Sequence, residues 1–264
     1  MRQKKQKFHL SEDETKVLED FTVLHRLVAD DYFGTVSKGD KGGWVEKESN
    51  LSHNGLCWIY DEAMVYGNAV VKDNAFIGDK AVIYSDEEYR NPSVVISGNA
   101  IVFGNAKVIG EAKIFNNAVV ADNAVVINGP CIFETARVDG SARIENRSMV
   151  YGSAEITDNA VISGFSRIHG HAKVQGNAKV MDDVELFGNT TVKGDITLSR
   201  WIHVFSDPQY PLVLDGKANI SEQNAGSFLY KQDVADKVLE KINSKLKKKE
   251  NSVSKNNNDL SNGL

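Results

Sequence analysis

Cysteine, proline and long apolar runs are all scarce in this chain. Its 264 residues include 2 cysteines, Cys57 and Cys131, and 4 prolines. Two cysteines far apart in sequence exclude a small domain that depends on a disulfide framework. No stretch approaches the roughly 18 to 20 apolar residues of a transmembrane helix, and the charged residues 1–7 are followed by no apolar run of the kind a secretory signal needs. We therefore expect a soluble cytoplasmic protein with reduced thiols and no membrane partner.

An excess of positive charge is also lacking. The formal net charge is −5, and charges of both signs are interspersed along the chain. Nucleic-acid-binding domains usually carry a basic face, so we expect no nucleic-acid partner. The length leaves room for one or two domains with a sizeable core.

What the chain does have is a period of six residues. From Val102 to Val204 an aliphatic residue occupies every sixth position without exception. A simple strand repeats at two residues and a helix at 3.6, so neither explains this period. It is typical of a hexapeptide β-helix, in which three short strands and three corners make a triangular coil of about eighteen residues. The series is Val102, Val108, Ile114, Val120, Val126, Ile132, Val138, Ile144, Val150, Ile156, Ile162, Ile168, Val174, Val180, Leu186, Val192, Leu198 and Val204.

The other hexapeptide positions agree with such a coil. The residue four places after the aliphatic one is usually alanine, as in Ala106 and Ala112, which suits a second inward position where the walls converge. Glycine two places after it, as in Gly104 and Gly110, suits a corner with positive φ. Asparagine recurs beside these glycines, which predicts ladders of side-chain hydrogen bonds. About twenty-five hexapeptides give about eight coils and a prism about 40 Å long.

The period divides the chain into parts. Residues 1–58 lack it and are expected to form an N-terminal capping region, in which Ser11–Glu14 resembles a capping box and predicts a short helix. Residues 59–209 carry the hexapeptide β-helix. Between Ile83 and Val102 the period is offset by one residue, which predicts a one-residue bulge or a small corner loop.

The C-terminal part has a different pattern. In residues 210–250 apolar side chains recur at a spacing of four, from Tyr230 to Leu246, which predicts an amphipathic α-helix. Residues 251–264 are rich in Lys, Asn and Ser and are predicted to be a disordered tail.

Several segments together resemble a known family. They are the lead-in at residues 38–46 (KGDKGGWVE), residues 50–52 (NLS), residues 58–60 (WIY) and the repeats themselves, over roughly residues 21–206. They are similar to the bacterial hexapeptide-repeat superfamily, and most similar to the YdcK-like proteins of bacteria and phages, which are regarded as acetyltransferases without an assigned substrate. The resemblance implies an all-β fold built on a left-handed parallel β-helix. To this the sequence patterns above add a small N-terminal cap and a C-terminal α-helix.

The same resemblance implies a function. It is that of a coenzyme A-dependent acyltransferase of unknown acceptor, with acetyl-CoA or another acyl-CoA as co-substrate, in a homo-oligomer that is most readily a homotrimer. We expect no metal, for the reason given with the histidines below. Because the repeat encodes shape rather than chemistry, a second hypothesis stays open. It is a non-catalytic β-helix binding or assembly protein, such as a phage protein that binds or inhibits a host component.

Two histidines are candidate catalytic residues by this resemblance. The superfamily's acetyltransferases use a surface histidine as general base, and His171 and His203 occupy outward or corner positions of the predicted coil. The alternative for each is a solvated surface histidine. His169 and His171 have no third histidine at the spacing of a three-histidine metal site, and no base is evident for Cys131. The residues that bind the co-substrate are unknown from sequence.

A period of eighteen residues singles out one face of the predicted prism. On that face the position after the inward aliphatic residue is almost always aromatic, whereas on the other two faces it is mixed. An apolar strip of this kind is typical of an interface, and the alternative is ring stacking that only stiffens the coil. Its partner is either the C-terminal helix returning along the prism or a second subunit. The predicted interface residues are Phe115, Phe133, Tyr151, His169, Phe187 and Phe205.

Overall fold

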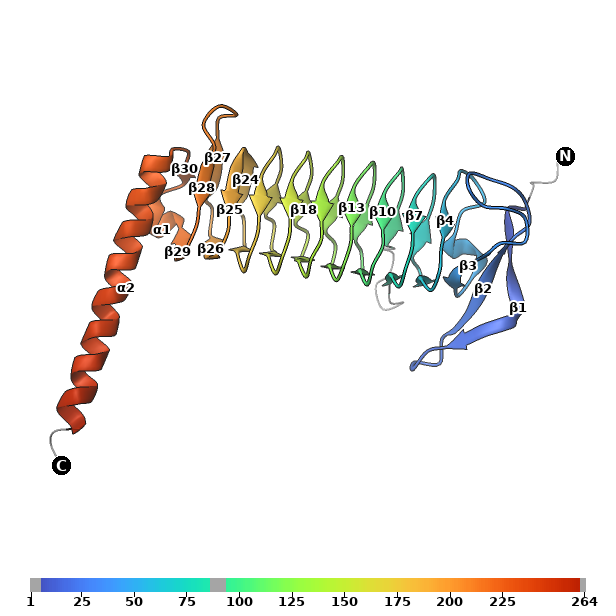
Figure 1. The fold of residues 1–264 in the computed structure, drawn as a ribbon, viewed down its shortest axis with the longest axis horizontal. Coiled ribbons are helices and arrows are strands. Elements are labelled where there is room, and N and C mark those ends of the chain that lie inside the picture. The colour runs from blue at the N-terminus through green and yellow to red at the C-terminus, as the bar shows by residue number, and fades with distance from the viewer. Residues whose placement is uncertain (1–5, 86–93, 262–264) are drawn as a thin grey trace.

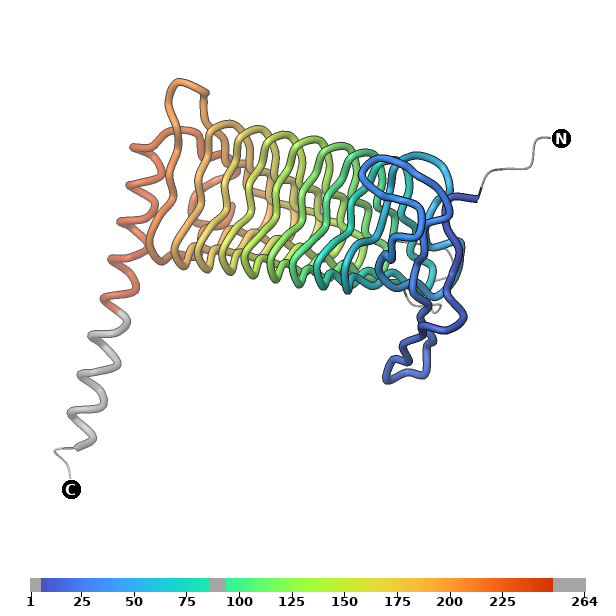
Figure 2. Tube along the Cα trace, turned by 45° about the vertical axis from the view of Figure 1, so that its right-hand side comes forward, coloured from blue at the N-terminus to red at the C-terminus, as the bar shows by residue number. Residues whose placement is uncertain are grey.

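The computed structural model describes residues 6–85 and 94–261, with side chains up to Lys248. It is a parallel β-helix whose strands stack into three flat walls along a straight prism (Figures 1 and 2). Along the chain each coil passes from wall A to wall B to wall C. Walls B and C have 9 strands each, so the prism makes about nine turns, one more than the sequence predicts.

The strands of each wall follow one another in chain order. Wall A consists of β3 (Lys41–Val45), β5 (Met64–Gly67), β8 (Val82–Ser85), β11 (Lys107–Ile109), β14 (Val125–Ile127), β17 (Arg143–Glu145), β20 (Val161–Ile162), β23 (Lys179–Val180), β26 (Asp195–Ser199) and β29 (Lys217–Ser221). Wall B consists of β6 (Val70–Val71), β9 (Val95–Ile96), β12 (Lys113–Ile114), β15 (Cys131–Ile132), β18 (Met149–Val150), β21 (Arg167–Ile168), β24 (Glu185–Gly188), β27 (His203–Ser206) and β30 (Phe228–Leu229). Wall C consists of β4 (Trp58–Ile59), β7 (Phe76–Ile77), β10 (Ile101–Val102), β13 (Val119–Val120), β16 (Arg137–Val138), β19 (Glu155–Ile156), β22 (Lys173–Val174), β25 (Thr190–Val192) and β28 (Leu212–Leu214).

The six-residue period fills the core as predicted. Every member of the Val102–Val204 series is fully buried, and so are the alanines four places on, such as Ala106 and Ala112. Serine replaces alanine at Ser148, whose Oγ donates to the carbonyl oxygen of Glu145 at 2.8 Å and so stays paired inside the prism. Each coil therefore adds one layer of apolar side chains from all three walls.

The corners need positive φ, and ladders of hydrogen bonds run along them. Gly104 has a φ of 74°, and Asp122 follows it one coil later with a φ of 58°. The backbone N–H of Gly104 donates to Oδ2 of Asp79 at 3.0 Å. Asn105 donates through Nδ2 to Oδ1 of Asn123 at 3.1 Å, which confirms the predicted asparagine ladder.

One coil is longer than the sequence suggests. Partners in adjacent coils lie 18 residues apart, as Asn99 and Asn117 do, but Asn74 and Asn99 lie 25 residues apart. The insertion between Ile83 and Val102 is therefore one hexapeptide plus one residue, so the predicted one-residue bulge is wrong, while the alternative of a small corner loop agrees with this length. A six-residue period cannot distinguish an insertion of one residue from an insertion of seven, because both shift the repeat by one position. Residues 86–93 of this segment lie outside the described residues.

The N-terminal region extends wall A instead of forming a helix. β1 (Phe8–Val17) pairs antiparallel with β2 (Val23–Ala29), which pairs antiparallel with β3. The helix predicted at Ser11–Glu14 is wrong, since these residues lie in β1, where the pairing shifts register. Ser11 Oγ still accepts a hydrogen bond from the N–H of Glu14 at 3.1 Å, so the motif makes a cap-like bond inside an irregular strand. A short 3₁₀ helix, η1 (Glu48–Asn50), lies between β3 and β4.

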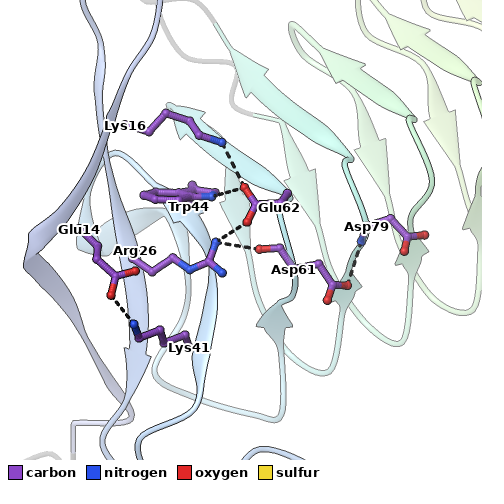
Figure 3. A network of polar contacts seen from close by, with 8 residues as sticks. All are labelled: Glu14, Lys16, Arg26, Lys41, Trp44, Asp61, Glu62 and Asp79. Atoms are coloured by element: carbon purple, nitrogen blue, oxygen red, sulfur yellow. Dashed lines mark hydrogen bonds and ion pairs between the residues drawn. The ribbon is translucent and has the colours of Figure 1, made fainter.

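A cluster around Trp44 joins this hairpin to the first coils (Figure 3). Lys16 Nζ and Arg26 Cζ lie 4.7 and 4.8 Å from the Trp44 ring centroid. Glu62 accepts hydrogen bonds from Trp44 Nε1 at 3.0 Å, Arg26 Nη1 at 3.0 Å and Lys16 Nζ at 3.3 Å. The Trp44 hydrogen bond, followed by those of the two cations, holds the pKa of Glu62 below its usual value.

The C-terminal elements close the other end. After β29 come α1 (Glu222–Ala225), β30 and α2 (Gln232–Ser261), and α2 contacts β28 and β29 across the end of the prism (Figure 1). Val234, Val238 and Ile242 pack against the core there. The hypothesis that the helix returns along the aromatic face is therefore wrong. The bounds of α2 also run into residues 251–264, where composition predicts disorder.

The limits of the repeat differ from the prediction at both ends. The parallel walls begin at β3, inside the predicted cap, and continue to β30, beyond the predicted end at residue 209. No helix in the described part of the chain has both the length and the apolar character needed to cross a membrane.

Candidate functional site

The outer surface of wall B carries a continuous stack of rings. Each of its strands points one aliphatic residue inward, so the residues directly before and after it point outward. On the seven strands from β12 to β30 the residues after it form the aromatic row, defined as Phe115, Phe133, Tyr151, His169, Phe187, Phe205 and Tyr230.

In-register parallel pairing causes this stacking. Phe187 pairs with Phe205 along the wall, and their ring centroids lie 5.0 Å apart at 6°. The other neighbours from Phe115 to Phe187 lie 4.6 to 5.1 Å apart, close to the roughly 4.8 Å spacing of strands. Because the faces of the rings contact one another, their edges point to the outside. The six predicted residues thus stack as one row, which Tyr230 lengthens at 5.7 Å from Phe205.

A second outward column lies beside the aromatic row. We call it the mixed column: the residues that precede the inward aliphatic residue on each strand of wall B. From the N-terminal to the C-terminal end they are Val70, Val95, Lys113, Cys131, Met149, Arg167, Glu185, His203 and Phe228.

Glu185 joins the two columns through two histidines. Its Oε2 lies 2.8 Å from His203 Nδ1, and its Oε1 lies 3.3 Å from His169 Nε2. Partial burial alone would raise the pKa of Glu185, but the hydrogen bonds from His203 and His169 outweigh it and leave that pKa lowered. The carboxylate is therefore ionised near neutral pH.

The charge of Glu185 fixes the orientation of His203. An ionised carboxylate can only accept hydrogen bonds, so Nδ1 of His203 must be the donor. The neutral ring then carries its lone pair on Nε2, which is the form a general base requires. Phe228 stacks on the ring at 5.2 Å and 18°, which restrains it on a second side.

The structure does not bring His171 to this group. Its side chain is exposed at the corner between walls B and C, and its backbone N–H donates to Gly188 at 3.1 Å. Within the described residues, no hydrogen bond or ion pair orients its ring. Sequence reasoning missed Glu185 and Phe228, although both lie in register with His203. Comparing the residues before the aliphatic position at a period of eighteen would have found Glu185.

A cavity of 440 Å³ lies at the C-terminal end of the aromatic row. The loop after β27 and the start of α2 form it. Its lining residues are Phe205, Asp207, Tyr210, Pro211, Tyr230, Lys231, Gln232 and Asp233. Phe205 follows His203 by two residues on the same outward side of β27, a distance of about 6.6 Å along a strand. His203 itself does not line the cavity, which begins at Phe205, two residues along the strand from the oriented imidazole.

Neither a cysteine nucleophile nor a metal site is favoured by the residues of this wall. Burial raises the pKa of Cys131, so its thiol is a poor nucleophile near neutral pH. Among the described residues, no group of three or more His, Cys, Asp or Glu side chains has a metal-binding arrangement.

Comparison with known proteins supports the resemblance over a limited stretch. No family model matches the chain. Over 62 residues it is 37% identical to a protein of Escherichia coli (strain K12) named "Uncharacterized acetyltransferase YdcK". The match covers 21% of this chain and 19% of that protein, so the chain aligns with about a fifth of the relative's length. The match and the parallel β-helix together agree with a YdcK-like, hexapeptide-repeat protein.

Proposed function

We propose that this protein is a coenzyme A-dependent acyltransferase in which His203 is the general base. The observation that carries the proposal is the 2.8 Å contact between His203 Nδ1 and Glu185, which leaves Nε2 as the basic atom. The similarity to a protein named as an acetyltransferase supports the choice of acyl-CoA as the co-substrate. The acceptor is a hydroxyl or amine that remains to be identified.

The residues of wall B have distinct roles in this proposal. Nε2 of His203 removes the proton from the acceptor as the acceptor's lone pair attacks the thioester carbonyl. Glu185 stabilises the imidazolium ion that forms. When the carbon–sulfur bond breaks, the imidazolium returns the proton to the departing thiolate of coenzyme A. Lys231 and the rings of Phe205 and Tyr230 line the cavity that begins at Phe205, two residues after this base on β27.

The test is the release of coenzyme A thiol from acetyl-CoA in the presence of panels of small amines and alcohols. We expect His203→Gln to lower turnover at least about 100-fold, the usual contribution of a general base. We expect Glu185→Gln to lower it as well, because an amide can present its NH₂ group and leave Nδ1 without an acceptor. The matched control is His9→Gln, since His9 Nδ1 also lies 2.8 Å from a carboxylate, that of Asp30, at the opposite end of the molecule.

His171 is replaced in the same assay, because the sequence nominates it too. Turnover that survives in His203→Gln but is lost in His171→Gln would move the general base to the corner histidine. Turnover that survives in both variants would remove histidine base catalysis from the proposal altogether.

One observation favours a second candidate function. The stacked row on wall B is a long, half-buried apolar strip on a rigid surface, as expected of a non-catalytic binding or assembly protein. A phage protein that binds a host component belongs to this class. Saturable binding of acetyl-CoA separates the two candidates, since only the acyltransferase requires it.

A further inference from the structure

A buried lysine lies against a buried cysteine at the N-terminal end of the prism. Lys7 directly precedes β1 and is 6% exposed, and Cys57 directly precedes β4 and is fully buried. Lys7 Nζ lies 3.4 Å from Cys57 Sγ, and it donates hydrogen bonds to the carbonyl oxygens of Cys57 at 2.9 Å and Gly55 at 3.5 Å. Lysine is rarely buried this far without a charged partner, and neither a thiol nor a carbonyl group is one. The contact therefore points to a role for the pair itself.

The fold holds the amine against the sulfur. The backbone N–H of Lys7 donates to His53 Nδ1 at 3.2 Å, and its carbonyl oxygen accepts from the N–H of Asp30 at 2.9 Å. Phe8 stacks on the His53 ring at 4.1 Å and 15°, and Nζ lies 4.9 Å from the centroid of the Phe33 ring. Because both backbone groups of Lys7 are bonded and its side chain is enclosed, Nζ has little freedom to leave the sulfur.

We propose that Lys7 Nζ and Cys57 Sγ form a modification site, at which a peroxide converts the contact into a covalent lysine–cysteine cross-link. The peroxide transfers one oxygen atom to the thiol, which becomes a sulfenic acid, and water is released. The lone pair of the neutral amine then attacks the sulfur. The nitrogen–sulfur bond forms as the sulfur–oxygen bond breaks, and the departing hydroxide leaves as water with the proton lost from Nζ. A second peroxide inserts one oxygen atom into this bond as N–O–S and releases another water.

The two groups supply what each step needs. Burial raises the pKa of Cys57, and a buried thiol alone reacts slowly because the thiolate is the reactive form. The charge and hydrogen bond of Lys7 counteract this effect, since they favour the thiolate. Burial also lowers the pKa of Lys7, which favours the neutral amine with its free lone pair. Lys7 therefore serves first as the proton acceptor for the thiol and then as the nucleophile.

A cavity gives a small oxidant access to the pair. It has a volume of 540 Å³, and Ser52 and His53 are among its lining residues. The carbonyl oxygen of Ser52 also lies 3.5 Å from Cys57 Sγ, so one loop separates the sulfur from the cavity. Small local openings of such a loop admit a molecule the size of hydrogen peroxide. A larger thiol is kept out, which leaves the amine of Lys7 as the group that captures the oxidised sulfur.

The cross-link would fasten the N-terminal hairpin to the first coil. It joins two positions 50 residues apart in the chain and ties the start of β1 to the start of β4. A covalent bond across such a loop restricts the unfolded chain. We therefore expect the oxidised protein to unfold at a higher temperature than the reduced one, with reversal by a thiol reductant.

Peptide mapping tests the modification site. The full chain carrying Cys131→Ser, which leaves Cys57 as its one thiol, is treated with millimolar hydrogen peroxide and digested with trypsin without reductant. Because trypsin does not cleave after a modified lysine, we expect residues 6–16 joined to residues 48–72. The mass should equal that of the two peptides less two hydrogen atoms, or this value plus one oxygen atom for N–O–S. Dithiothreitol should separate the two peptides.

Two variants in the same background identify the amine. Lys7→Arg keeps a positive charge but lacks a nucleophilic amine, so it should give neither the cross-link nor the rise in thermal midpoint. The matched control is Lys47→Arg, because Lys47 is also a hydrogen-bonded lysine of this region but lies on Asn68 and not on the sulfur. It should cross-link like its parent.

The parent protein decides the question even if Lys7→Arg does not fold. Oxidation of Cys57 to a sulfinic or sulfonic acid with Lys7 unmodified would overturn the proposal. A Cys57 thiol that stays reduced in the folded protein at millimolar peroxide would overturn it as well, and so would a cross-link to any other lysine.

Discussion

At the scale of single residues, the corners determine whether the coil can turn. They require positive φ, which glycine adopts freely and Asp or Asn tolerates. Gly104 and Asp122 occupy equivalent corners with φ of 74° and 58°. A Cβ added to Gly104 would lie 2.8 Å from backbone atoms of Asp122. The sequence pattern of alternating glycine and aspartate thus reflects both a backbone conformation and a close approach.

At Gly104 we expect the loss of stability to depend on how well the substituted residue tolerates positive φ. We expect Gly104→Val to destabilise the protein by about 2 kcal/mol or more, because a β-branched residue is strained at positive φ and the added Cβ is crowded. Gly104→Asn should cost about half as much, since asparagine tolerates this conformation. Thermal and urea midpoints of the two variants provide the measurement. Equal losses for Val and Asn would show that backbone conformation is not the limiting factor.

At the scale of elements, the Trp44 cluster fastens the N-terminal hairpin to the prism. Glu62 is its acceptor and has a lowered pKa. A carboxylate with a lowered pKa in the folded state stabilises that state above the pKa of the unfolded chain, about 4.3 for Glu. That contribution is lost as the pH falls through the lowered, folded-state value. Because the side chain is half exposed, solvent screening keeps the effect small.

We expect the difference in thermal stability between the wild type and Glu62→Gln to depend on pH. Glu62→Gln should lower the thermal midpoint relative to the wild type at pH 7, and this difference should shrink steadily below about pH 4.3. Glu14→Gln is the matched control, because Glu14 lies in the same hairpin and pairs with Lys41 of β3, but its carboxylate does not accept a hydrogen bond from Trp44 (Figure 3). A difference independent of pH would show that the charge of Glu62 contributes nothing.

The elements also show what the sequence could and could not predict. The inward series and the aromatic row were predictable, because in-register stacking turns a period of six and a period of eighteen directly into positions. The strand around Ser11 was not, since a Ser-x-x-Glu motif makes the same local bond in a helix cap and in an irregular strand. The path of α2 was not either, because the apolar stripe containing Val238 fits the end of the prism as well as its side. Glu185 was missed because its role depends on neighbours one coil away in each direction.

At the scale of the whole molecule, the protein is a stack in which each coil contacts mainly its neighbours. Stability in such a solenoid is approximately the sum of coil and interface contributions. The natural insertion between Asn74 and Asn99, 25 residues apart, shows that one corner accommodates extra length while the walls stay in register. The number of coils is therefore expected to be adjustable, whereas the register is not.

Deleting one coil tests this description. Removal of residues 119–136, one full period of 18 residues, should leave a shorter prism that unfolds cooperatively at a lower midpoint. Removal of residues 120–136 is the control, because one residue fewer shifts the inward side chains of the following strand to the outside. Circular dichroism and chemical unfolding provide the comparison. If both deletions behave alike, register does not govern the fold.

The proposed function requires that wall B bind an acyl-CoA beside the oriented histidine, His203. The most direct measurement is a calorimetric titration of the full chain with acetyl-CoA, which needs no knowledge of the acceptor. The account predicts saturable binding, with a dissociation constant below about 1 mM, the upper range of enzyme substrates. An absence of binding at millimolar acetyl-CoA would contradict the acyltransferase and leave the non-catalytic binding protein as the function of this prism.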